Sequence, residues 1–203
     1  MTSRNAPPVL PVRLVVGLGN PGAAYERTRH NAGFWWLEDL AHELGVTLAA
    51  EKRFFGEVAS ARTSAGEVRL LRPLTFMNLS GQAVGAVARF HGIAPEQILV
   101  AHDELDLPAG SLRLKFGGGH AGHNGLRDID RHLNSRDYWR LRIGIGHPRD
   151  SAQMAKPVAD WVLERPRADE QEAIESALQR AITVHPSLLA GDFVGAMQTL
   201  HAA

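Results

Sequence analysis

The sequence predicts a single α/β domain in which a twisted mixed β-sheet is flanked by helices. Short apolar, β-branched runs alternate with segments whose apolar residues recur at helical spacing. Two of these runs, 54–61 and 68–72, are separated only by a turn at 63–66, which indicates a tight hairpin and hence a mixed sheet. A chain of 203 residues with 44% hydrophobic side chains is long enough for one domain with a sizeable core.

The first strand and the first helix are expected near the N-terminus. Residues 12–16 are mostly apolar and β-branched, which is typical of a buried strand. A turn rich in Gly, Asn and Pro follows at 17–22, and the apolar residues at 37–44 then recur at helical spacing before Gly45 ends the helix. His30 is therefore expected near a helix start and close to this turn.

The later elements follow from the same patterns. Ser80 is expected to cap a helix that ends at Gly92, which places Asn78 in the preceding loop. The other expected elements are strands at 98–101, 112–116 and 141–146, a glycine loop at 117–125, and helices at 126–133 and 193–200. We expect residues 1–11 to be a disordered extension of a domain at 12–203 that is helical from about residue 157.

The composition excludes several classes of function. The chain contains no cysteine, which excludes disulfides, thiol nucleophiles and cysteine-ligated metals. No stretch approaches the ~20 apolar residues of a membrane span, and residues 1–8 lack the apolar core of a signal peptide. The sequence therefore predicts a cytoplasmic protein without a membrane segment.

Charge is distributed unevenly along a chain whose formal net charge is zero. Residues 111–149 contain eight Lys and Arg against three acidic residues, a local charge of +5, whereas 150–203 contain four against eight, a local charge of −4. This asymmetry favours a basic face contributed by the third quarter of the chain, suited to a polyanion.

Polar side chains gather at expected strand ends and in loops, and they suggest hydrolysis without a covalent nucleophile. Such a site needs a base with a pKa near neutrality, an acid that orients it, and neutral amide donors for a developing oxyanion. The candidates for these roles are Asn20, His30, Asn78, Asp103, His123 and Asn124. The sequence contains no G-x-S-x-G elbow, no H-E-x-x-H zinc motif and no phosphate-binding P-loop.

Two other interpretations remain open from the residues alone. The turn at 17–22 matches G-x-G-x-x-G, a dinucleotide-binding pattern, although Pro21 and Gly22 disfavour a helix that opens at the glycines. His120 and His123, together with Asp103, could instead hold a metal ion, although a flexible glycine loop is a poor platform for metal ligands.

Six blocks in order between residues 12 and 148 resemble the bacterial peptidyl-tRNA hydrolase family. They are VVGLGNPG at 15–22, TRHNAG at 28–33, PLTFMNLSG at 73–81, HDELD at 102–106, GGGHAGHNG at 117–125 and LRIGIGHP at 141–148. The resemblance implies a phosphorylase/hydrolase-like fold and a cytoplasmic monomer without cofactor or metal. It also implies that the protein cleaves the ester between a peptide and the 3′-terminal ribose of tRNA, contacting the acceptor stem and 3′ end of peptidyl-tRNA.

The resemblance also implies roles for individual residues. His30 would activate water, Asp103 would orient His30, and Asn20 would position the ester and its oxyanion. Substrate-binding roles would fall to Tyr25, Met77, Asn78, Asn124 and His123, with Tyr25 and Met77 as pocket walls. Phosphate groups of the tRNA would bind Lys115 and Arg142, with Arg113 beside them. The chain departs from the family pattern at Ala121 and at the bulky pair Trp35 and Trp36, none of which is a catalytic position.

A non-catalytic RNA-binding module of the same fold is the alternative function. Chloroplast intron-splicing relatives of the family are the precedent, and they require a plastid transit peptide. Residues 1–8 are too short and too poor in Ser and Arg for such a peptide, and both His30 and Asp103 are present. The sequence therefore favours the hydrolase.

Overall fold

The apolar runs form one mixed sheet, as expected, in a computed structural model that describes residues 9–201. Its strands are β1 (Leu14–Gly17), β2 (Ala49–Glu51), β3 (Gly56–Thr63), β4 (Gly66–Pro73), β5 (Ile98–Glu104), β6 (Leu112–Phe116) and β7 (Trp139–Gly144). The strand order is β2-β3-β4-β1-β5-β7-β6. Strands β4, β1, β5 and β7 run parallel, and the β3–β4 hairpin and the edge strand β6 make the sheet mixed. Residues 1–8, which belong to the expected disordered extension, lie outside the described residues.

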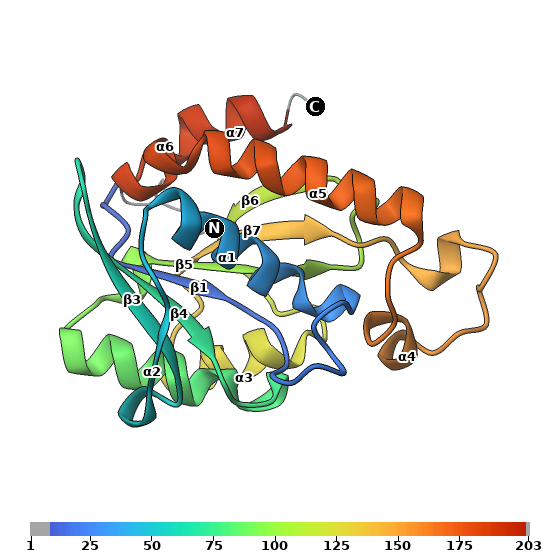
Figure 1. The fold of residues 1–203 in the computed structure, drawn as a ribbon, viewed down its shortest axis with the longest axis horizontal. Coiled ribbons are helices and arrows are strands. Elements are labelled where there is room, and N and C mark those ends of the chain that lie inside the picture. The colour runs from blue at the N-terminus through green and yellow to red at the C-terminus, as the bar shows by residue number, and fades with distance from the viewer. Residues whose placement is uncertain (1–8, 202–203) are drawn as a thin grey trace, which may run out of the picture.

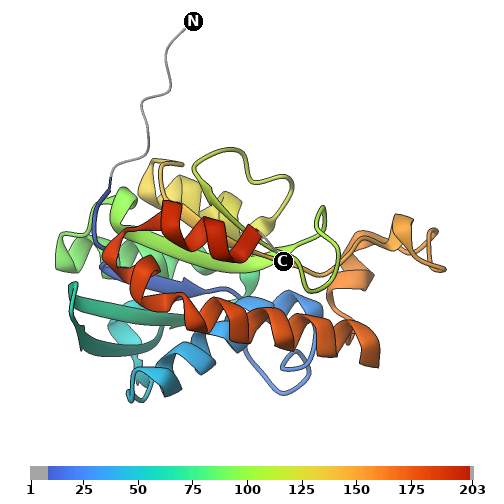
Figure 2. The same cartoon turned by 90° about the horizontal axis from the view of Figure 1, so that it is seen from above.

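Helices cover both faces of the sheet (Figure 1). They are α1 (Ala32–Glu43), α2 (Ser80–His91), α3 (Asn124–Leu133), α4 (Val158–Val162), α5 (Ala168–Thr183), α6 (His185–Ala190) and α7 (Phe193–His201). Helices α2 and α3 cover one face, while α1 packs on the other face together with α5, α6 and α7, which Figure 2 shows from above. The ring of Trp139 in β7 stacks on Phe193 of α7, with 3.6 Å between ring centroids. Burial of apolar side chains in these two layers drives folding.

Gly19 and Gly33, from the first two blocks at 15–22 and 28–33, allow α1 to pack closely on the sheet. A Cβ atom on Gly33 would clash with the backbone of Leu18 and Ala101, and one on Gly19 would lie 2.7 Å from the ring of Phe34. Helix α1 begins at Ala32, well beyond the turn at 17–22. Close helix-to-strand contact therefore accounts for these glycines without a bound nucleotide.

The structure corrects three local expectations. Ser80 is the first residue of α2 rather than its cap, because its Oγ donates a hydrogen bond back to the carbonyl of Met77 at 2.8 Å. The strand expected at 98–101 continues to Glu104, because β7 supplies a parallel partner for every residue from Leu99 onward. The exposed edge strand β2 lacks the apolar alternation that would have predicted it.

The carboxyl ends of the parallel strands carry the polar motifs, as is usual in α/β sheets. Asn20 follows β1 and Asn78 follows β4. Asp103 is the penultimate residue of β5. Helix α4 lies beyond the end toward which β7 points (Figure 1). Among the described residues, no helix is long and apolar enough to cross a membrane.

Candidate active site

A buried carboxylate shared by two imidazoles forms the centre of the site. Both carboxylate oxygens of Asp103 lie 2.9 Å from Nδ1 of His30, and Oδ1 also lies 3.0 Å from Nε2 of His123. Asp103 is 3% exposed, so both contacts are shielded from water. His30 comes from the 3-10 turn Arg29–Asn31 before α1, and His123 directly precedes α3. The fold therefore joins three segments that are distant in sequence.

The surrounding hydrogen bonds assign the proton positions on both rings. His123 caps α3 by accepting hydrogen bonds at Nδ1 from the backbone amides of Gly125 and Leu126, so its proton must be on Nε2, facing Asp103. His30 likewise faces Asp103 with Nδ1, which leaves the lone pair of the neutral ring on Nε2. Among the described residues, the side-chain hydrogen bonds of His30 involve Nδ1 only, so Nε2 is available to accept a proton.

Burial and charge shift the ionisation of this cluster in opposite directions. Burial raises the pKa of Asp103, but its attractions to His30 and His123 outweigh burial and hold that pKa far below its usual range. Burial lowers the pKa of His30, whereas the charge and hydrogen bond of Asp103 raise it, and the net pKa is raised above 6.5. Asp103 is therefore ionised and stabilises a proton on His30.

Asn20 presents a neutral amide donor near this cluster. Its backbone N–H donates to Oδ1 of Asn31 at 2.9 Å, and its carbonyl accepts from Nδ2 of Asn31 at 3.0 Å. Its side-chain Oδ1 accepts from the backbone amide of Met77 at 2.8 Å. The carboxamide orientation is thereby fixed, and the hydrogen bonds of Asn20 within the described residues leave its Nδ2 without a partner. A preorganised N–H donor of this kind suits a developing oxyanion.

The other expected substrate residues lie around Asn20 and the start of α3. Met77 is 4% exposed, and a Cβ atom on Gly125 would lie 2.6 Å from its Sδ, so Met77 packs against the first turn of α3. The ring of Tyr25 meets the exposed ring of Phe76 edge-on at 6.3 Å. Asn78 is exposed in the 3-10 turn Met77–Leu79, and Asn124 is exposed at the start of α3.

A cavity of about 390 Å³ opens beside the cluster. His30, Asp103, His123 and Asn124 contribute to its wall, as do Lys115, Arg142 and three apolar residues of α4. The apolar residues are Val158, Ala159 and Val162. Imidazole, carboxylate, amide and cationic groups therefore line the same hollow.

The expected cations share one face of the β6–β7 ladder but differ in their partners. Arg113 is opposite Arg142, and Lys115 is opposite Arg140. Nε of Arg142 donates to Glu104 at 2.8 Å, and a guanidinium nitrogen of Arg113 donates to a neighbouring carbonyl at 2.7 Å. Lys115 is exposed and has no ion-pair partner among the described residues. Lys115 is thus the cation most available to a phosphate group.

Arg140 was not anticipated from the sequence, and it holds the glycine loop in place. It is 2% exposed, and its two terminal nitrogens donate to the carbonyls of Gly119 and Gly118 at 2.8 and 2.7 Å. The loop leads directly to His123 and Asn124. The sequence of β7 could have drawn attention to Arg140. Arg140 and Arg142 are two residues apart in an otherwise apolar strand, so their side chains share one face of the sheet.

The geometry also redefines the possible metal ligands. Ligand atoms of His30, Asp103 and His123 lie within 4.8 Å of one another, a spacing that could hold a metal ion. His120, which the sequence grouped with His123, instead accepts a hydrogen bond at Nδ1 from the amide of Gly122 at 3.1 Å and is not part of this group. The imidazole nitrogens that face Asp103 donate protons to it, so a metal would have to displace both hydrogen bonds.

Comparisons with known proteins agree with the resemblance. A family model described as peptidyl-tRNA hydrolase matches residues 14–203. Proteins named peptidyl-tRNA hydrolase from Bordetella parapertussis and Bordetella avium are each 58% identical over 193 residues, which is 95% of this chain and 89% and 93% of theirs. A crystal structure of peptidyl-tRNA hydrolase from Acinetobacter baumannii is 47% identical, with a TM-score of 0.86 over 93% of this chain and 94% of that one.

Proposed function

The chain belongs to the peptidyl-tRNA hydrolase family, and from this premise we propose that the cavity beside His30 hydrolyses the ester between a peptide and the 3′-terminal ribose of tRNA. The observation that carries the proposal is the contact between Asp103 and Nδ1 of His30, which leaves the free Nε2 as a base. A non-catalytic RNA-binding module is not favoured, because the matched relatives are named as hydrolases.

The proposed reaction uses water as the nucleophile. Nε2 of His30 takes a proton from water as the water oxygen attacks the ester carbonyl, and the imidazolium that forms is stabilised by Asp103. Nδ2 of Asn20 donates to the resulting oxyanion. Collapse of the tetrahedral intermediate breaks the bond to the ribose 3′-oxygen, which takes the proton from His30. The products are a free peptide carboxyl group and tRNA, and no covalent intermediate with the protein is formed.

His123 has a positioning role in this proposal. Its Nδ1 and Nε2 already have protein partners, so it acts on the substrate through Asp103 and through the start of α3. The same imidazole that caps α3 places Asn124, its neighbour, at the cavity wall.

Discrimination against free aminoacyl-tRNA follows from the neutral amides. Asn78 and Asn124 would bond to the peptide group nearest the ester. An aminoacyl-tRNA carries an α-ammonium group there, and each polar group left unpaired costs about 1–3 kcal/mol. The proposed site therefore accepts a blocked amino group and rejects a charged one.

The tRNA would bind chiefly through its phosphates. Within residues 9–201, Lys115 has no ion-pair partner, whereas Arg142 shares its charge with Glu104. Phosphate contacts supply affinity without reading sequence, which suits an enzyme that accepts many tRNAs. We propose a monomer that acts in the cytoplasm, where ribosomes release the substrate, on the 3′ end and acceptor stem.

The test is a pair of matched substrates in the presence of a chelator. N-acetyl-aminoacyl-tRNA and the same aminoacyl-tRNA without the acetyl group are incubated with the purified protein. We expect release of the acetylated amino acid only. Cleavage that stops on chelation would favour a metal on His30, Asp103 and His123, and binding of both tRNAs without cleavage would favour the RNA-binding module.

A further inference from the structure

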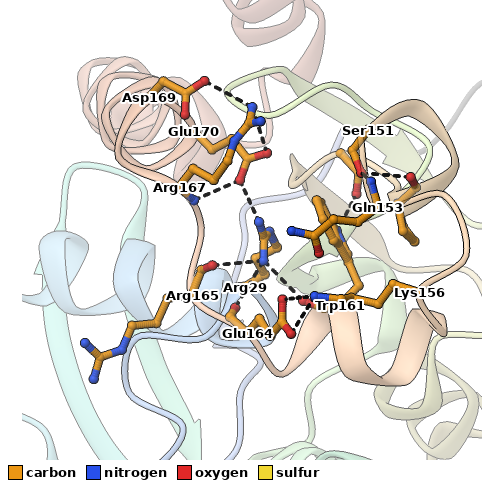
Figure 3. Close-up of polar contacts among 12 residues, drawn as sticks. Arg29, Ser151, Gln153, Lys156, Trp161, Glu164, Arg165, Arg167, Asp169 and Glu170 are labelled. Atoms are coloured by element: carbon orange, nitrogen blue, oxygen red, sulfur yellow. Dashed lines mark hydrogen bonds and ion pairs between the residues drawn. The ribbon is translucent and has the colours of Figure 1, made fainter.

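The residue before the proposed base is a buried cation that the reaction does not use. Arg29 is 2% exposed, although it lies in the short turn that carries His30. Burial of a charge is unfavourable unless hydrogen bonds and an opposite charge compensate for it. Figure 3 shows that the compensating groups all come from the segment 161–170.

Four hydrogen bonds and one aromatic ring surround the guanidinium group. Nη1 donates to the carbonyls of Trp161, Glu164 and Arg165 at 3.4, 3.5 and 3.0 Å. Nη2 donates to the carboxylate of Glu170 at 2.6 Å, and Cζ lies 3.8 Å above the ring of Trp161. The backbone amide of Arg29 also donates to the carbonyl of Glu164 at 3.0 Å. Only the planar fork of an arginine can satisfy this set of acceptors.

The segment that Arg29 holds forms one wall of the catalytic cavity. Val158, Ala159 and Val162 line the cavity together with His30. Helix α4 has only five residues, which is too short to be stable without tertiary contacts. Trp161 is also secured to the loop after β7 by a hydrogen bond from its Nε1 to the carbonyl of Gly146 at 3.0 Å, and Trp161 and Val162 are buried in the core. Core burial of Trp161 and Val162 and the contacts of Arg29 together hold α4 beside the base.

We propose that Arg29 is a positioning residue that seats α4 as a wall of the catalytic cavity and ties that wall to the turn carrying His30. The inference rests on the proposed function of the cavity. Loss of the fork allows the segment 158–165 to move away from His30, which widens the site and admits bulk water. The substrate is then held less closely to the base, and kcat/KM falls.

Two variants and a matched control test the proposal. Arg29→Lys keeps the charge but removes the fork, and Glu170→Gln keeps an acceptor but removes its charge. Arg167→Lys is the control, because Arg167 contacts the same Glu170 carboxylate, at 3.5 Å, but is 60% exposed and outside the cavity. The measurements are kcat/KM for N-acetyl-aminoacyl-tRNA, the melting temperature, and amide hydrogen exchange resolved by peptide.

We expect kcat/KM to fall at least tenfold for Arg29→Lys and less for Glu170→Gln, with no change for the control. Amide exchange should rise at least tenfold in 158–165 and stay unchanged in β1, β5 and β7. Unchanged exchange in 158–165 of a folded Arg29→Lys protein overturns the proposal. A uniform rise throughout the molecule also overturns it, because Arg29 would then stabilise the fold in general.

The two variants remain informative if one of them does not fold. Should Arg29→Lys be insoluble, Glu170→Gln decides, since its carboxylate is partly accessible and its loss leaves the three carbonyl contacts in place. A local rise in exchange with lower kcat/KM then supports the proposal, and wild-type values for both overturn it. Exchange does not depend on activity, so a wild-type protein that cleaves nothing would refute the proposed function separately.

Discussion

Replacement of Asp103 by asparagine tests the centre of the site most directly. Asp103→Asn keeps the size of the side chain but removes the charge that faces Nδ1 of His30 at 2.9 Å and Nε2 of His123 at 3.0 Å. Both imidazole nitrogens donate protons to the carboxylate, whereas an asparagine offers only one oxygen and presents an N–H to the other donor. The variant therefore leaves the imidazolium of the transition state without its counter-charge.

The size of the effect follows from the distance. Two unit charges about 4 Å apart attract by about 4 kcal/mol at an effective dielectric constant of 20. Because ~1.4 kcal/mol changes a rate tenfold, we expect kcat/KM to fall about a thousandfold. Burial of Asp103 at 3% exposure argues against a smaller effect, since water cannot replace the lost charge.

The assay is the initial rate of N-acetyl amino acid release from tRNA, measured as a function of pH. In the wild type the net pKa of His30 is raised, with burial lowering it and Asp103 raising it, so activity is lost as pH falls through that raised pKa. Without the carboxylate the pKa falls, and the acidic limb of kcat/KM moves to lower pH. Asp150→Asn removes the same charge from an exposed pair with Arg149 and should change kcat/KM less than twofold. A folded Asp103→Asn protein within tenfold of wild type, with an unshifted acidic limb, would refute the reasoning.

Three further predictions concern stability and tRNA binding. The pKa of Asp103 is lower in the folded protein than its unfolded value of 3.8. The ionised carboxylate therefore stabilises the fold above pH 3.8, and this stabilisation is lost progressively as the pH falls below that value. Calorimetry from pH 5 to pH 2 should show a steeper fall in melting temperature for wild type than for Asp103→Asn. Lys115→Ala should weaken tRNA binding and reduce the slope of log affinity against log salt concentration by about 1. Glu104→Gln should strengthen tRNA binding, because it frees Arg142 from its ion pair. Filter binding at several salt concentrations measures both effects, and slopes equal to that of wild type would contradict them. Gly33→Ala should destabilise the fold by about 1–3 kcal/mol through overpacking, and Gly119→Ala, where an added Cβ meets nothing within 4 Å, should unfold at a higher denaturant concentration than Gly33→Ala.

Much of the fold could be predicted because its elements have local periodicity. Strand β6 has the predicted bounds of 112–116, since its apolar and basic residues alternate and one face is buried. The hairpin at 56–73 was recognisable from its turn residues. The extension of β5 through Asp103 could not be predicted, because polar residues continue the strand only when a neighbouring strand pairs with them. The cap expected at Ser80 was wrong, because its hydroxyl found a carbonyl in the preceding turn.

The candidate site could be predicted in its residue types but not in its connections. His30 and Asp103 are recognisable as a base and an acid at the ends of elements, but their contact joins positions 73 residues apart. The second donor to Asp103, His123, depends on the cap that His123 makes to α3. Arg29 has no local signature at all, because its partner Glu170 is 141 residues away and each looks like an ordinary charged residue.

The pairing of Arg29 with Glu170 joins the turn that carries His30 to a segment made 141 residues later during synthesis. A growing chain on the ribosome is itself a peptide esterified to tRNA, which is the kind of bond this family cleaves. By residue 103 the nascent chain already contains both His30 and Asp103, whereas α4 and the acceptors for Arg29 lie later, at 158–170. Because a domain generally folds as a unit, the wall of the cavity forms only after the segment 158–170 has emerged. The cavity is therefore complete only after the segment 158–170 has been made, which is well after both His30 and Asp103.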